Sequence, residues 1–112
     1  MDKLVHGGNI KKLEKKFHSD MLEGSQLAKK LGYNPTYFLR MVSDIGGVQA
    51  AKQLIKADKP SDGFTTLWEL GRLDLSVEAH VLKLEYEILF SDEERQTCLH
   101  RLEAYGYKPV IS

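Results

Sequence analysis

A run of apolar residues at three- and four-residue spacing occupies the N-terminal part of the chain. These residues are Ile10, Leu13, Phe17, Met21, Ala28 and Leu31. Because successive residues of an α-helix lie about 100° apart, this spacing places all of them on one face, opposite the lysines of the same segment. The segment therefore predicts a long amphipathic helix. Such a helix has to cover its apolar face with other elements, which restricts the folds open to the chain.

Glycines and capping residues divide the rest of the chain into short helical segments. Helix ends are expected at Gly32, Gly46-Gly47, Gly71 and Gly106, and helix starts at Asn34-Pro35, Thr66 with Glu69, Ser76 or Asp74, and Ser91 with Glu94. Gly24-Ser25 is a candidate kink in the first helix. No alternating segment is long enough to predict a strand. We expect an all-α fold, a compact single-domain bundle of about six helices.

The length and composition limit the organisation of the protein. A chain of 112 residues can bury one core but not two. We expect residues 1–8 to form a flexible leader and residues 9–112 a single helical domain, with residues 59–63 as a turn within it. No apolar run approaches the length of a membrane span or of a secretion signal, and the only cysteine, Cys98, cannot form an internal disulfide. These features favour a cytoplasmic location.

The net charge of zero conceals a division between the two halves of the chain. Residues 1–60 contain 11 Lys and Arg against 6 Asp and Glu, whereas residues 61–112 contain 5 against 10. A basic half can bind a polyanion. Attraction between the two halves, within one fold or in a dimer, explains the division equally directly. We favour this second interpretation because exposed charges are only weakly constrained.

Basic residues of the first half form a candidate surface for nucleic acid or for a protein partner. They are Lys12, Lys16, Lys30, Arg40, Lys52 and Lys56. Phosphate contacts from such residues give salt-dependent affinity, and residues 35–57 have the helix–glycine–helix pattern that a helix-turn-helix also has. Acidic residues interrupt the lysine face of the first helix, and that face contains no arginine. A solvated polar face is therefore the commoner explanation.

The segment from Ser61 to Leu82 contains the only tryptophan. We interpret Trp68, Arg72, Asp74 and Glu78 as a structural corner: Arg72 is expected to bind Asp74 or Glu78, and Trp68 to fill the core.

The same segment also offers a candidate set for acid–base or metal chemistry, formed by Asp74, Glu78 and His80. Glu78 and His80 are two residues apart, however, a spacing that places them on different sides of a helix. We therefore predict no catalytic residue, no metal ligand and no cofactor.

Two longer stretches, YFLRMVSDIGGVQAAKQL and SDGFTTLWELGRLDLSVEAHVL, continue through LFSDEER to RLEAYGY. Together they resemble a family of small all-helical bacterial proteins of uncharacterised function, over roughly two-thirds of the chain. The resemblance implies an accessory or partner-binding role, because such segments occur alone or beside nuclease-like domains in nucleic-acid or defence pathways. It transfers no functional residue.

Three functions follow from these observations as hypotheses. The first is a non-enzymatic helical interaction or accessory module in a bacterial cytoplasm and not at a membrane. It would bind a protein partner, or itself, through an exposed part of the Trp68–His80 corner or through the basic first helix. The second is a nucleic-acid-binding accessory domain whose binding weakens on Lys-to-Glu changes at Lys12, Lys16 and Lys30. The third is a small metal-dependent hydrolase or nuclease using Asp74, Glu78 and His80.

Overall fold

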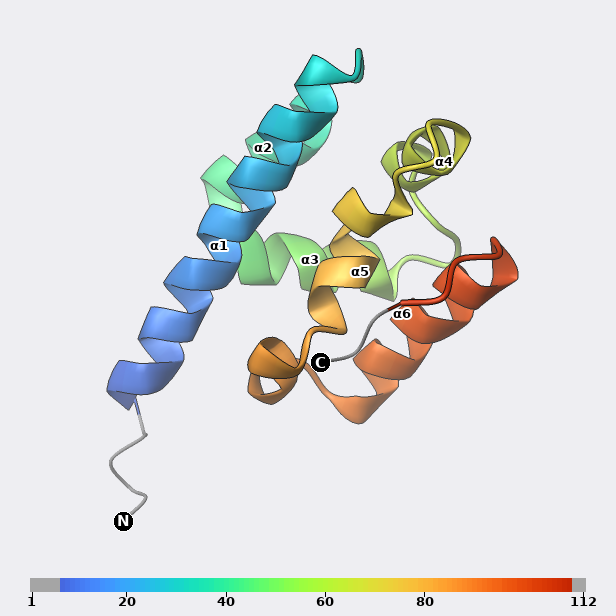
Figure 1. The fold of residues 1–112 in the computed structure, drawn as a ribbon. Helices are drawn as coiled ribbons and strands as arrows, with labels where there is room; N and C mark the ends of the chain where they lie inside the picture. The colour runs from blue at the N-terminus through green and yellow to red at the C-terminus, as the bar shows by residue number, and fades with distance from the viewer. Residues whose placement is uncertain (1–6, 110–112) are drawn as a thin grey trace.

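The computed structural model describes residues 7–109, and these residues form only helices and the turns between them. The elements are α1 (Gly7–Lys30), α2 (Thr36–Ile45), α3 (Gly47–Lys56), α4 (Asp62–Glu69), the 3₁₀-helix η2 (Leu73–Leu75), α5 (Val77–Val81), the 3₁₀-helix η3 (Leu84–Leu89) and α6 (Asp92–Ala104) (Figure 1). No strand occurs among the described residues, so the predicted all-α class is confirmed. Most of the predicted leader lies outside the described residues, and α1 begins at Gly7, before the predicted end of that leader at residue 8.

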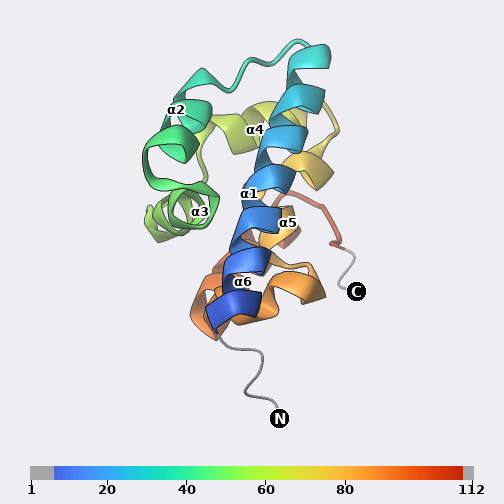
Figure 2. The ribbon, with the colours of Figure 1, turned by 90° about the vertical axis from the view of Figure 1, so that its left-hand side faces the viewer.

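Helix α1 runs along one side of the molecule, and the other elements pack against its apolar face (Figures 1 and 2). Phe17, Met21 and Ala28 are almost completely buried, whereas Leu31, just beyond the end of α1, is 40% exposed. The predicted amphipathic face is therefore confirmed along most of the helix.

Helix α1 is unbroken at the candidate kink. The Ser25 hydroxyl donates a hydrogen bond to the Met21 carbonyl at 3.0 Å, so this polar side chain is satisfied inside the buried face. Gly24 lies beside η2 and α5, and a Cβ atom there would lie 3.6 Å from both the Leu75 carbonyl oxygen and His80 Cε1, which are ordinary contact distances. The expected kink is therefore absent, and the packing around Gly24 would admit a Cβ atom.

The two glycines between α2 and α3 have different functions. Gly46 has a φ angle of 87°, a left-handed conformation that ends α2. Gly47 is the first residue of α3, and its N–H donates to His18 Nδ1 at 3.0 Å. A Cβ atom at Gly47 would lie 2.8 Å from the Cα of His18, so α1 and α3 cross at a point where a larger residue does not fit.

The helix starts differ from the predictions at two places. Helix α4 begins after Ser61, whose side chain accepts the Phe64 N–H, so the capping box predicted at Thr66 is wrong and Thr66 lies inside the helix. Helix α2 begins at Thr36 without a side-chain cap, although Asn34 was expected to supply one. The caps predicted at Ser76 and at the Ser91–Glu94 box are confirmed.

The structural corner around Trp68 is partly as predicted. Arg72 forms two hydrogen bonds with Asp74, at 2.9 and 3.0 Å, and this pair lies at the surface. Trp68 does not fill the core: it is 46% exposed and rests edge-on against Tyr105. Because α4 has only two turns and turns Phe64 and Leu67 inward, the neighbouring Trp68 is directed toward the surface.

Candidate functional site

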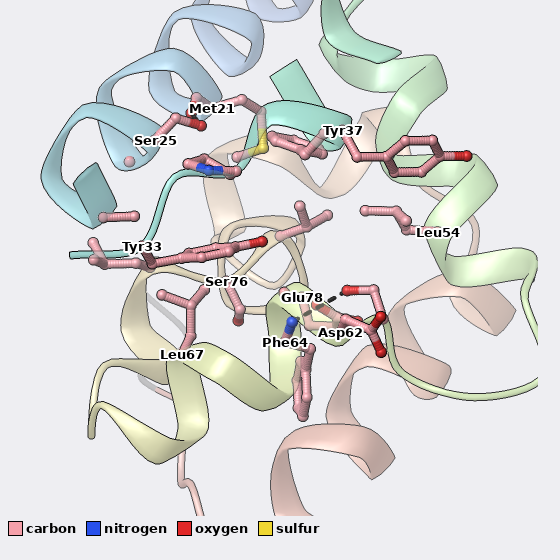
Figure 3. A pocket seen from close by; sticks show the side chains of 18 residues that line it. Met21, Ser25, Tyr33, Tyr37, Leu54, Asp62, Phe64, Leu67, Ser76 and Glu78 are labelled. Carbon is pink, nitrogen blue, oxygen red and sulfur yellow. Dashed lines mark hydrogen bonds between the residues drawn. The ribbon is translucent and has the colours of Figure 1, made fainter. Parts of the chain in front are cut away.

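An apolar cavity of about 320 Å³ lies between the C-terminal half of α1 and the elements that face it (Figure 3). Its lining comes from α1, α2, α3, α4, η2, α5 and the turns that follow α1 and α3. The apolar lining side chains include Met21, Phe38, Leu54, Phe64, Leu67 and Val77. An apolar cavity of about 150 Å³ is enough to hold benzene, so this space can accept a large apolar side chain or a small ligand.

Small residues on α1 explain why the space exists. Between Met21 and the end of the helix, the face turned toward α4 and α5 presents Gly24, Ser25 and Ala28. Because these side chains are short, they fill little of the space beside this part of the helix. The neighbouring turn of α1 carries Phe17, which is fully buried and packs against Tyr86 and Phe90. The N-terminal half of α1 is therefore filled by aromatic residues, whereas the C-terminal half leaves a cavity.

Tyr33 forms one wall of the cavity. Gly32, with a φ angle of 96°, ends α1 and turns the chain so that the Tyr33 ring faces α4. A Cβ atom at Gly63 would lie 2.5 Å from the Tyr33 hydroxyl, so the ring lies directly against the backbone of α4. Burial raises the pKa of Tyr33, and the nearby Asp62 carboxylate raises it further.

A buried ion pair supports the side of the cavity formed by α5. The Arg101 guanidinium donates to Glu78 Oε2 at 3.1 Å and to the carbonyls of Leu54, Ile55 and Ala57 at 3.1, 3.3 and 2.7 Å. Glu78 is 3% exposed and Arg101 is 9% exposed. Arg101 thus caps the C-terminal carbonyls of α3 and joins α3, α5 and α6. Burial raises the pKa of Glu78, although its hydrogen bonds and the charge of Arg101 act in the opposite direction.

The candidate acid–base set is not assembled into one site. Asp74 pairs with Arg72 at the surface, and Glu78 pairs with Arg101 in the interior, so the predicted alternative of an Arg72–Glu78 pair is wrong. His80 is buried, and its Nδ1 bonds the Ser76 carbonyl at 2.8 Å. In residues 7–109 no three His, Cys, Asp or Glu side chains are grouped so that they can hold a metal ion. Each member of the set has a separate structural partner.

The candidate basic surface extends over α1, α2 and α3, and its members differ in their partners. Lys12, Lys30, Arg40 and Lys56 are exposed. Lys16 contacts Glu85 at 2.9 Å and Asp20 at 3.8 Å, and Lys52 contacts Glu94 at 2.9 Å. Two of the six basic side chains therefore bind acidic residues of the C-terminal half, as attraction between the halves within one fold requires.

Neither the cavity nor the Glu78–Arg101 pair was among the sequence predictions. The small residues at positions 24, 25 and 28, on the buried face of an otherwise large-residue helix, were the available signal for the cavity. For the ion pair, the available signal was the spacing of Arg101 on α6. It lies three residues after Cys98 and directly before Leu102, two apolar residues that the structure shows to be fully buried, so a helix places Arg101 on the same inner face.

Among the helices of the described residues, none is both long and apolar enough to cross a membrane. The chain matches no protein-family model, no curated protein and no solved structure. The resemblance to small helical bacterial proteins therefore stays a prediction.

Proposed function

We propose that this protein is a non-enzymatic interaction module that binds a partner protein by accepting an apolar side chain of that partner into the cavity. The family resemblance adds the expectation that this happens in a bacterial cytoplasm. The cavity is the observation that supports the proposal. The space of about 320 Å³ is partly open to solvent and mainly apolar, so an apolar side chain of a partner that enters it would remove apolar surface of both proteins from water.

The polar groups of the lining support binding rather than catalysis. Ser25 and Ser76 use their hydroxyls within the helices, and Glu78 is held by Arg101. These groups have structural partners, so they are poorly placed to activate a substrate. The rim offers aromatic contact area instead, because Tyr37 lines the cavity and is 76% exposed. Tyrosine is enriched among the residues that dominate protein–protein binding energy, which fits an apolar anchor inserted beside it.

Nucleic-acid binding by the basic surface is the alternative, and it has less support. Lys16 and Lys52 are engaged by carboxylates, which reduces their attraction for phosphates. Low-salt titration with duplex DNA, single-stranded DNA and RNA tests it. Binding that weakens uniformly in Lys12→Glu and Lys30→Glu variants favours the alternative over the cavity.

A displayed library of random 16-residue peptides tests the proposal. The wild-type protein is expected to enrich peptides that share one large apolar or aromatic position. An Ala28→Leu variant, which places a larger side chain in the lining, is expected to lose this enrichment. An Ala104→Leu variant is the matched control, since Ala104 is an exposed residue of α6. The proposal fails if no peptide is enriched, or if Ala28→Leu enriches the same peptides. Light scattering shows whether a second copy is the partner.

A further inference from the structure

The charges around the cavity are all of one sign. Of the residues that line it, Asp62 and Glu78 are acidic, and none is lysine, arginine or histidine. This asymmetry is specific to the cavity, because the chain as a whole contains 16 basic and 16 acidic residues. The lining itself therefore contains acidic side chains and no basic one.

The two carboxylates are not equivalent. Glu78 is buried and paired with Arg101, a residue of α6 that does not line the cavity. Asp62 is exposed and lies in the first turn of α4, on the same side of the cavity as Phe64 and Glu78 (Figure 3). Among the described residues, no cation lies within ion-pair distance of its carboxylate. Asp62 is therefore the charge that the rim of the cavity presents to a partner.

The start of α4 opposes this charge only in part. A helix N-terminus carries roughly half a positive charge, which is less than the full negative charge of an aspartate. Burial raises the pKa of the Tyr33 hydroxyl, and the charge of Asp62 raises it further, so the carboxylate lies close enough to act on groups of the lining. The rim consequently favours a cation placed close to the apolar anchor.

We propose that the partner segment carries a lysine or arginine within one helical turn of the apolar side chain that enters the cavity, and that Asp62 binds this cation at the rim. This inference rests on the proposed function and specifies the chemistry of the partner. Tyr37, also at the rim, supplies an aromatic surface on which the aliphatic part of the basic side chain can lie.

The same peptide library, selected against four proteins, tests the inference. Wild type and Glu87→Gln are expected to enrich the anchor together with a lysine or arginine. Glu87→Gln is the matched control because it removes one negative charge from η3, which contributes no residue to the lining. Asp62→Asn is expected to keep the anchor and lose the basic preference, and Asp62→Arg to prefer an acidic residue instead.

A binding titration gives the size of the effect. For a peptide selected by the wild type, Asp62→Asn is expected to raise Kd about three- to fivefold at low salt, as for one exposed ion pair, and less at high salt. The peptide with glutamine in place of its basic residue is expected to bind both proteins equally. Thermal unfolding of Asp62→Asn confirms that the variant is folded.

The outcomes separate the two proposals. An enriched apolar anchor without a basic residue overturns this inference and leaves the proposed function standing. A basic preference that persists in Asp62→Asn, or an equal loss of affinity for both peptides, also overturns it. A library that yields no anchored peptide on the wild type overturns the proposed function and this inference together.

Discussion

At the scale of single residues, Arg101 joins three helices, because this residue of α6 forms hydrogen bonds with α5 and with the end of α3. It donates to Glu78 and to three carbonyls at the end of α3 while being only 9% exposed. Replacing it with methionine keeps much of the volume but leaves a buried carboxylate and the carbonyls without donors. We expect Arg101→Met to lower the free energy of unfolding by about 3–5 kcal/mol, measured by urea denaturation. The same change at the surface pair, Arg72→Met, is expected to cost less than about 1 kcal/mol. Equal losses would contradict a structural role for the buried pair.

His80 makes the stability of the protein depend on pH. Burial holds the pKa of His80 below its ordinary value, although the bond to the Ser76 carbonyl acts in the opposite direction. The folded imidazole therefore stays neutral where the unfolded one already binds a proton. Its contribution to stability is present above the unfolded pKa, about 6.5, and is lost as the pH falls from there toward the folded pKa.

A comparison with His80→Asn measures this contribution. Asparagine can keep the hydrogen bond to Ser76 but does not titrate. The free energy of unfolding of the wild type is expected to fall more steeply between pH 7.5 and pH 5 than that of the variant. Parallel pH profiles would show that His80 is not the group responsible.

At the scale of elements, glycines set how closely the helices approach α1. Gly47 meets the Cα of His18 at the crossing of α1 and α3, whereas Gly24 has ordinary contact distances to η2 and α5. We expect Gly47→Ala to lower the free energy of unfolding by about 1–3 kcal/mol, because the two backbones have to move apart. Gly24→Ala is expected to raise it by about 0.5–1 kcal/mol through helix propensity. Chemical denaturation of both variants checks this. A higher free energy of unfolding in Gly47→Ala, or one lower by more than about 1 kcal/mol in Gly24→Ala, would contradict the packing described for α1.

Helix starts and ends that depend on nearby residues were predictable from the sequence. The Ser91–Glu94 box and the glycines that end α1 and α6 involve atoms a few residues apart, so their pattern suffices. The cap of α4 was missed: the spacing of Thr66 and Glu69 also fits a capping box, but the helix begins five residues earlier, after Ser61. Capping and glycine patterns in the sequence therefore predict where a helix occurs more reliably than they predict its first residue.

At the scale of the whole molecule, pairing and cavity formation depend on residues that are distant in sequence. Arg72 and Arg101 were equally available to Glu78, and only the packing of α5 against α6 selects the second. The cavity depends on small side chains of α1 facing elements of roughly fifty residues later. A sequence pattern indicates which face of a helix is buried. It does not indicate how completely the side chains of two facing helices fill the space between them, and a cavity depends on that.

The cavity also makes a prediction about the balance between stability and function. A side chain that fills empty apolar space buries additional area without displacing others. We therefore expect Ala28→Leu to raise the free energy of unfolding by about 0.5–2 kcal/mol, while Ala104→Leu stays within about 0.5 kcal/mol of the wild type. Urea denaturation of the three proteins measures this. If Ala28→Leu destabilises the fold, the cavity cannot adapt to the larger side chain, and a partner's anchor would enter it only with rearrangement. If the variant is more stable and yet binds no peptide, the space beside Ala28 lowers the stability of the wild type and is needed for binding. That combination is expected of a binding site.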